Sequence, residues 1–242
     1  MTTPGARLRL DRVDALRGVA IVWMAVFHVC FDLNHLGFLV PRQAFTHDPF
    51  WTGQRTAIVS LFLFCAGLAQ AISLHQGQTW PRFWKRWAQI AGCAVLVSVG
   101  SAWMFPRSWI FFGVLHGIAV MLVIARVAAP LRSGLWLLGA AALALPVLAA
   151  HPLFDAPALQ WLGLVTRKPL TEDYVPVLPW LGVMLWGLAA GQMLLAQGGG
   201  PMAGTIPQAA APLALLGRWS LTFYMLHQPL FIGALMLYKA VR

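Results

Sequence analysis

Long apolar runs, separated by short polar connections, make up most of this chain. Seven runs approach the roughly 20 residues that a helix needs to cross the hydrocarbon core of a bilayer. They lie at about 14–34, 56–75, 88–105, 109–129, 133–150, 176–196 and 218–240. The runs are continuous rather than alternating, which favours helices over the strands of a membrane β-barrel. The pattern predicts an all-α polytopic membrane protein, with about seven transmembrane helices in one bundle.

Two connections differ from the simple turns between the other runs. Residues 152–170 are apolar in patches but broken by prolines and charges, so we expect a re-entrant or interfacial piece there. Residues 198–212, rich in glycine, alanine and proline, read as a flexible cytoplasmic linker before the last span. No internal repeat is visible, and residues 1–242 are predicted to form a single transmembrane domain.

The composition supports a membrane protein and its charge suggests an orientation. Of the 242 residues, 60% are hydrophobic and 10% are charged, against about 25% charged in soluble proteins. The formal net charge is +10, and the cations border the apolar runs. This placement fits topology and contact with anionic lipid headgroups rather than nucleic acid, and also leaves room for a basic mouth that attracts an anionic cofactor.

Lysine and arginine counts favour a cytoplasmic N-terminus and an external C-terminus. The first run is read as an uncleaved span rather than a signal peptide, because it contains His28 and ends in Asp32. In this orientation the cytoplasmic side holds Arg7, Arg9, Arg12, Arg17, Arg82, Lys85, Arg86, Arg126, Arg132 and Arg218. The outer side holds Arg42, Arg55, Arg107, Arg167, Lys168, Lys239 and Arg242.

The first span carries an unusual stripe of ionisable residues. At about 100° per residue, one helical face within roughly 80° collects Asp14, Arg17, Ile21, Met24, His28, Asp32 and His35. Ionisable groups inside a span are costly and mark candidate functional sites. We therefore expect this face to turn into the protein or toward a water-filled cavity.

His28 is the candidate general base on this stripe. Asp32 lies four residues later, where the two side chains can meet on a helix. A carboxylate that accepts a hydrogen bond from one ring nitrogen fixes the tautomer of the histidine and raises the basicity of the other nitrogen. The alternative is a structural polar network that holds helices together.

Further candidates lie in the loop after the first span and at the start of the second. Arg55 is placed at the outer edge, where it snorkels, stabilises an oxyanion or binds an acidic substrate. His47 precedes it in the external loop, where a solvated loop residue is the simpler reading.

Later spans add polar residues that are either structural or line a site. His116 sits close to Gly113 and Gly117, so it is expected to point into the bundle. In the last span, Ser220, Tyr224, His227 and Gln228 share one helical face. The cysteines Cys30, Cys65 and Cys93 all fall inside spans and form no paired motif, so neither disulfides nor a metal site is expected.

Several short motifs follow one another along these segments. In order they are Val13–Gly18, Phe27-His28, Phe31–Asn34, Leu61–Phe64 with Gly67, Phe112–His116, Leu178–Gly182, Leu216–Arg218 and His227–Pro229. In this order they resemble the motifs of membrane-bound acyltransferases. Two related groups are similar: the acyltransferase family 3 proteins and, more closely, the small bacterial members of the heparan-α-glucosaminide N-acetyltransferase catalytic-domain family.

The resemblance implies acyl transfer across a membrane, here a bacterial inner membrane. Acetyl-CoA would approach from the cytoplasm, and the acetyl group would reach a hydroxyl or amine on the outer side, on a glycan or another small polar acceptor. The essential arginine and histidine of acyltransferase family 3 correspond to Arg17 and His28. The catalytic histidine of the heparan enzyme lies in the loop after the first span, which makes His47 a second candidate.

The predicted mechanism follows from these residues. His28, oriented by Asp32, would deprotonate the acceptor, and Arg17 would meet the CoA phosphates. Weaker phosphate candidates are Arg82, Lys85 and Arg86, and the oxyanion could be stabilised by Arg55, His116, Tyr224 or His227.

Two other classes of function stay open at this point. A proton-coupled transporter could use the His28/Asp32 pair as a proton relay. A structural or regulatory subunit could keep the fold without activity. The missing repeat and the spacing of Arg17 and His28 favour the enzyme over the transporter, and the presence of Arg17, His28 and Asp32 argues against an inactive subunit.

Overall fold

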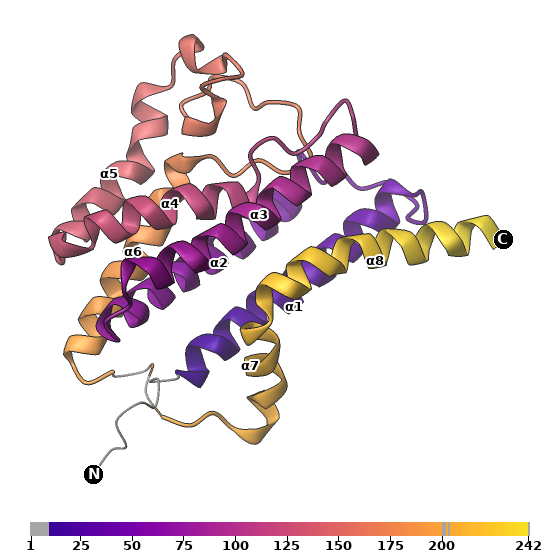
Figure 1. Cartoon of the computed structure of the whole chain (residues 1–242). Coiled ribbons are helices and arrows are strands. Elements are labelled where there is room, and N and C mark those ends of the chain that lie inside the picture. Colours follow the sequence, from indigo (N-terminus) through magenta and orange to yellow (C-terminus); the bar gives the residue numbers. More distant parts are fainter. Residues whose placement is uncertain (1–9, 200–201, 203, 242) are drawn as a thin grey trace. The chain divides into compact units, whose positions relative to one another are not determined.

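The chain folds into helices joined by turns and loops. A computed structural model describes residues 10–199, 202 and 204–241 (Figure 1). The main helices are α1 (Asp11–His35), α2 (Pro49–His75), α3 (Trp80–Met104), α4 (Val114–Ala128), α5 (Gly134–Ala149), α6 (Val177–Ala196), α7 (Ala211–Arg218) and α8 (Ser220–Val241). The described residues form no strand, only an isolated bridge between Phe112 and Tyr174. The all-α prediction is confirmed, while Arg7, Arg9 and Arg242 of the charge count and positions 200, 201 and 203 of the predicted linker lie outside the described residues.

Six of these helices are long and apolar enough to cross a membrane, close to the predicted seven. They are α1, α2, α3, α6, α8 and the segment Val114–Leu131, in which α4 continues into a short 3₁₀ turn, η1 (Ala129–Leu131). The predicted run at 133–150 forms α5, which has only 16 residues. At 1.5 Å per residue it is about 24 Å long, shorter than the roughly 30 Å of a bilayer core.

Several boundaries differ from those that hydropathy predicts. Helices α2 and α3 begin at Pro49 and Trp80, seven and eight residues before the predicted runs at 56 and 88, because hydropathy leaves out the polar and charged residues of their first two turns. Residues 152–170 form only two 3₁₀ turns, η2 (Pro152–Asp155) and η3 (Gln160–Leu162), joined by loops.

Helix α7 differs from the sequence prediction, in which the linker extends to residue 212 and the last span begins at 218. Proline in its first turn and the leucine and alanine residues that follow are good helix-start and helix-forming residues. The chain breaks at Trp219 and continues as α8 from Ser220. Only the last two residues of the predicted linker, Ala211 and Pro212, therefore belong to this helix.

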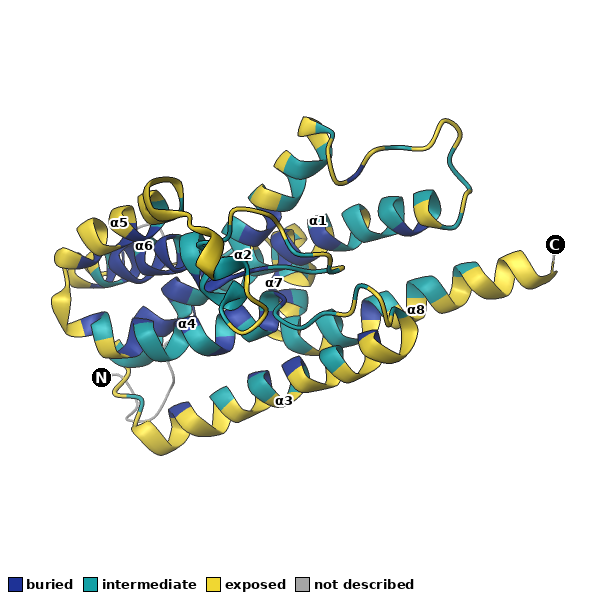
Figure 2. Ribbon diagram, turned by 90° about the horizontal axis from the view of Figure 1, so that it is seen from above, coloured by how far each residue is buried: buried dark blue, intermediate teal, exposed yellow. Residues whose placement is uncertain are grey.

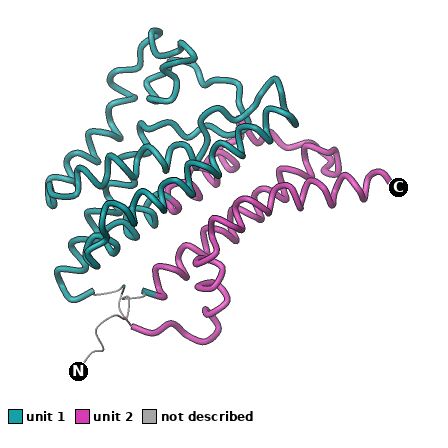
Figure 3. The backbone as a smooth tube through the Cα atoms, viewed as in Figure 1, with its two compact units in different colours: residues 1–10, 63–203 teal, residues 11–62, 204–242 magenta. Residues whose placement is uncertain are grey.

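The helices group into two compact units (Figure 3). Unit 1 comprises residues 1–10 and 63–203, and unit 2 comprises residues 11–62 and 204–242. The boundary falls within α2, so its first half belongs to unit 2 and its second half to unit 1. The prediction that all 242 residues form one domain stays a prediction.

Helix α6 is the core of unit 1. Eleven of its residues are buried, and glycines let its neighbours approach closely. A Cβ atom on Gly182 would lie 2.5 Å from the carbonyl oxygen of Gly139 on α5, and one on Gly187 would lie 2.2 Å from that of Phe64 on α2. Such close backbone contacts are typical of helix packing in membranes. Helices there associate by van der Waals packing rather than by the hydrophobic effect, and small residues let the backbones approach closely.

Unit 2 is built on α1, against which α7 and α8 pack. The α1–α7 contact is tighter than any side chain allows. A Cβ atom on Gly18 would lie 1.9 Å from the carbonyl oxygen of Leu213, and one on Gly217 would lie 1.8 Å from that of Asp14. The two glycines therefore permit a backbone-to-backbone seam between α1 and α7.

The surfaces of α3 and α8 carry large apolar side chains. Figure 2 shows both helices exposed along much of their length, with exposed Val95, Leu96 and Val99 on α3 and Leu230 and Leu237 on α8. Such faces suit contact with lipid. On α1, Ile21, Met24 and Asp32 of the predicted inward face are buried, while Val22 and Val26 on the other faces are exposed. The prediction that this face turns inward is confirmed for these three positions, but its last member, His35, is exposed.

Candidate functional site

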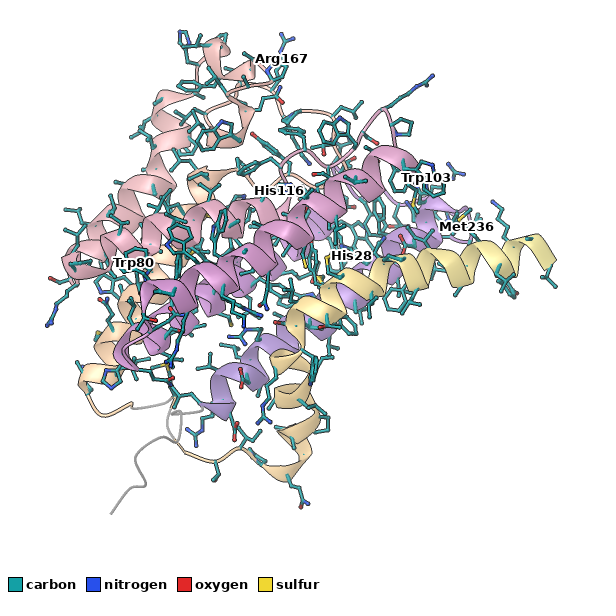
Figure 4. The ribbon with its side chains drawn as sticks, viewed as in Figure 1. His28, Trp80, Trp103, His116, Arg167 and Met236 are labelled. Atoms are coloured by element: carbon teal, nitrogen blue, oxygen red, sulfur yellow. The ribbon has the colours of Figure 1, made fainter. Side chains whose placement is uncertain are left out.

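A pair of histidines forms the centre of the candidate site in unit 2. His28 Nδ1 on α1 lies 2.7 Å from His227 Nε2 on α8. The two rings are nearly parallel, with centroids 4.9 Å apart. His227 is 4% exposed, and Figure 4 shows His28 on α1 beside α8. Residues 199 positions apart therefore meet in a single hydrogen bond.

The hydrogen bonds of His227 fix where the protons of this pair lie. His227 Nδ1 is 2.8 Å from the carbonyl oxygen of Tyr224 and 3.2 Å from that of Phe223. A carbonyl oxygen can only accept, so His227 Nδ1 carries the proton and its Nε2, in the neutral ring, is an acceptor. His28 Nδ1 must then be the donor of the 2.7 Å bond. The Nε2 atom of a neutral His28 is left with a free lone pair, as a general base requires.

Asp32 does not take the place predicted for it. Its Oδ1 atom accepts a 2.8 Å hydrogen bond from Gln228 Nε2 on α8, and among the described residues no hydrogen bond joins it to His28. The prediction that Asp32 orients His28 is therefore wrong. A spacing of four residues lets two side chains meet, but each finds a partner on α8 instead, and His227 orients His28.

Aromatic rings enclose the histidine pair. Phe223 stacks on His227 and Phe231 meets it edge-on, with centroids 5.6 and 5.9 Å away. The Tyr224 ring lies tilted at 5.8 Å, and its backbone carbonyl holds His227. Phe27 contacts the edge of His28. These rings limit the rotation of the imidazoles and shield them from water on several sides.

Arg17 lies at the α1–α7 seam. Its Nη1 atom donates to Asp14 Oδ1 at 3.1 Å and to the carbonyl oxygen of Gly217 at 3.3 Å. Arg218 pairs with Asp11 at 2.7 Å and with Asp14 at 3.6 Å. Both Arg17 contacts use one nitrogen, and within the described part of the chain Nε and Nη2 have no hydrogen-bond partner. Arg17 thus fastens α7 to α1 and still has donors for a phosphate.

Within the described part of unit 2, neither His47 nor Arg55 is hydrogen-bonded to the histidine pair. His47 is exposed in the turn before α2. Arg55 is half-buried, and the structure shows no hydrogen bond or ion pair from it to another described residue. Its neighbour Gln54 accepts a 2.6 Å hydrogen bond from Trp23 Nε1, which fixes this part of α2 to α1.

His116 belongs to unit 1, where its hydrogen bonds are structural. Its Nδ1 atom accepts from the backbone N–H of Gly113, and its Nε2 atom lies 3.0 Å from Ser98 Oγ. Ser98 Oγ also donates to the carbonyl oxygen of Ile110. An acceptor role at Nδ1 leaves Nε2 as the donor to Ser98, so neither His116 nor Ser98 is free to act as a base or a nucleophile in this arrangement.

The basic residues of unit 1 divide into exposed and buried ones. Arg82, Lys85 and Arg86 are exposed near the start of α3. Arg126 is 7% exposed, donates to Gln78 through two nitrogens, and lies over the Trp80 ring at 4.4 Å. This residue was counted only as a cytoplasmic charge, and its apolar surroundings gave no sign of its buried role.

Outside the spans, two titratable groups of unit 1 stabilise the loop that contains η2 and η3. Hydrogen bonds from the Thr166 hydroxyl and backbone N–H lower the pKa of Asp155. Burial, with a smaller effect of the nearby Asp155 charge, raises the pKa of Tyr174 to about 12. Tyr174 therefore stays neutral and donates its hydroxyl to the carbonyl oxygen of Gln160.

No group of three histidine, cysteine, aspartate or glutamate residues that could hold a metal ion is found over 10–199, 202 and 204–241. The three cysteines are free thiols.

Comparison with protein families agrees with the motifs. The family model described as heparan-alpha-glucosaminide N-acetyltransferase, catalytic, matches residues 9–229. The chain belongs to this family. No curated protein and no solved structure matches the chain significantly.

Membership of the heparan-alpha-glucosaminide N-acetyltransferase catalytic family, together with the apolar helices, indicates a membrane acyltransferase. The match includes the α1 segment with Arg17 and His28, α7, and the start of α8 with His227. Sequence reasoning found these residues but not their pairing, because the contact depends on how α8 packs against α1. The signals that pointed to this end of the chain were the shared helical face of Tyr224, His227 and Gln228 and the order His227–Pro229.

Proposed function

We propose that the protein transfers an acetyl group from cytoplasmic acetyl-CoA to an amine or hydroxyl of a sugar-like acceptor on the outer side of the membrane, with His28 as the general base. Two observations support the proposal: the family match over residues 9–229 and the hydrogen bond of His28 to His227. The second carries the chemistry, because it leaves the lone pair of His28 Nε2 available.

The reaction requires one proton acceptor at the attacking group. The acceptor nitrogen or oxygen attacks the thioester carbonyl carbon while His28 Nε2 takes its proton. The C–S bond of the tetrahedral intermediate then breaks, and the imidazolium returns the proton to the departing thiolate. His227, held by two backbone carbonyls, keeps the His28 ring in one orientation throughout.

Arg17 and Arg55 are the proposed cationic contacts. Arg17 and His28 are eleven positions apart, about 16 Å along the helix, a distance suited to a CoA arm between its phosphates and its thioester. The free Nε and Nη2 atoms of Arg17 can bind a phosphate in a bidentate way. Arg55, with no ion pair among the described residues, is proposed to stabilise the oxyanion; Tyr224 is a second candidate.

The test uses purified full-length protein in liposomes, with labelled acetyl-CoA and separate acceptors that offer an amine or only hydroxyls. In His28→Asn the amide nitrogen replaces the Nδ1 donor toward His227, but nothing replaces Nε2. We expect acetyl transfer to fall by roughly 10²–10⁴-fold, while binding of acetyl-CoA persists. His75→Gln, at the exposed end of α2, is the matched control and should transfer at the wild-type rate.

Two results would contradict the proposal. One is wild-type turnover in His28→Asn. The other is proton flux through the protein in liposomes without any acetyl transfer, which would favour the transporter and would also show that the family match does not extend to activity here.

A further inference from the structure

The contact between Asp32 and Gln228 has an unusual balance of donors and acceptors. Gln228 Nε2 donates to Asp32 Oδ1 at 2.8 Å. The other oxygens of the two groups, Asp32 Oδ2 and Gln228 Oε1, are both buried and have no hydrogen-bond partner among the described residues. If Asp32 were ionised, these two buried oxygens would both be acceptors, and neither would receive a hydrogen bond.

The histidines beside this contact and the basic residues of α7 and α8 do not supply the missing donor. His28 Nδ1 donates to His227 Nε2, and His227 Nδ1 donates to backbone carbonyls of α8. Toward the C-terminal end of α8, Lys239 donates to the carbonyl oxygen of Leu36. On α7, Arg218 pairs with Asp11 and Asp14. Each of these groups has a partner other than Asp32.

An ionised Asp32 would also be poorly solvated. Asp32 is only 2% exposed and lies in a helix long and apolar enough to span a membrane. In the described part of the chain no salt bridge reaches its carboxylate. A buried charge without a cation or a full set of hydrogen bonds is strongly unfavourable, and the enclosed oxygens leave no surface for water or a ligand ammonium group.

We propose that Asp32 is a carboxylic acid whose Oδ2–H donates to Gln228 Oε1, so that α1 and α8 are joined by a two-bond acid–amide pair holding one proton. A single proton supplies the donor that both unpartnered oxygens lack. It also removes the charge from this part of the α1–α8 contact. The proposal does not depend on acetyl transfer, and it makes the pair a proton-holding structural contact beside the histidines.

Infrared difference spectroscopy tests the protonation directly. A protonated carboxyl has a C=O band that is separate from the carboxylate bands and shifts when the proton is exchanged for deuterium. The chain has only seven acidic residues, and Asp32 is the buried one among them. At pH 7 the wild-type spectrum should contain such a band, which Asp32→Asn removes and the control Asp11→Asn retains. If the band is missing from the wild-type spectrum, or survives in Asp32→Asn, the proposal is wrong.

Thermal unfolding in detergent gives a second, independent test. Asparagine at position 32 offers an N–H to Gln228 Oε1 and an oxygen to Gln228 Nε2, as the neutral acid does. We expect Asp32→Asn to unfold within about 2 °C of the wild type, and Gln228→Leu to unfold roughly 4 °C or more lower because it leaves a buried acid unpartnered. Gln208→Leu, at an exposed glutamine, should change nothing. Equal destabilisation by Asp32→Asn and Gln228→Leu would show that the ionised carboxylate is needed, and no effect of Gln228→Leu would show that the pair is not a structural contact; either result overturns the proposal.

Discussion

Single hydrogen bonds decide which nitrogen of His28 is available for chemistry. Two backbone carbonyls of α8 require a proton on His227 Nδ1, so His227 Nε2 is an acceptor. His28 Nδ1 must then carry the proton of the bond between the two rings. The free Nε2 of His28 therefore results from the position of α8, and not from the nearby Asp32. Sequence spacing pointed to His28 as the candidate base and to Asp32 as its orienting residue, a place that His227 takes in the structure.

The orienting role of His227 predicts graded effects on catalysis. His227→Leu removes the acceptor for His28 Nδ1, so we expect kcat for acetyl transfer to fall by roughly 10²-fold, because a misplaced base loses most of its effect. KM for acetyl-CoA should stay unchanged. His227→Gln, whose amide oxygen can replace Nε2 as the acceptor, should recover part of the rate. Steady-state kinetics in liposomes measure both constants, and an unchanged kcat in His227→Leu would refute the role.

At the scale of elements, the α1–α7 seam explains two of the segments on which the family resemblance rests. Leu16-Arg17-Gly18 on α1 and Leu216-Gly217-Arg218 on α7 face each other. The glycines allow the backbones to touch, and the arginines bind the aspartates and a carbonyl at the seam. Arg17 thus serves the packing of two helices, whatever its role toward a phosphate.

The seam makes Gly18 sensitive to the smallest side chain. The Cβ atom of Gly18→Ala would lie 1.9 Å from a backbone oxygen of α7, so the helices must separate. We expect a loss of stability of about 1–3 kcal/mol or more. Gly92→Ala is the matched control, because nothing lies within 4 Å of that position on α3 and alanine favours helix. Thermal unfolding in detergent compares the two, and equal midpoints would argue against a close seam.

At the scale of the whole molecule, the predicted topology depends on α5, which must cross the membrane to give seven spans. With α5 in the membrane, the chain crosses seven times, and the termini lie on opposite sides. Its length of about 24 Å requires local thinning of the bilayer or snorkelling of flanking residues. Arg132 and Ser133, at its start, provide a polar end on the predicted cytoplasmic side.

Cysteine labelling tests this topology. In a variant without Cys30, Cys65 and Cys93, single cysteines replace the exposed residues Thr46, Ser133 and Leu170. A membrane-impermeant maleimide added to intact cells from which the outer membrane has been removed should label positions 46 and 170, and should reach position 133 only after permeabilisation. Labelling of 133 and 170 from the same side would show that α5 does not cross.

The sequence by itself determined the helical membrane fold and most of the inward face of α1, and it marked His28 as the candidate base, because hydropathy and helical periodicity are local properties that a span cannot avoid. It also contained the helix-forming residues of α7, although a run of alanine and proline hid them. Tertiary structure alone decided the partners. Asp32 lies one turn from His28 but binds Gln228, and His28 binds a residue 199 positions away. The reason is physical: a buried polar group takes the donor or acceptor that packing brings within about 3 Å, and packing between distant helices leaves no mark in local spacing.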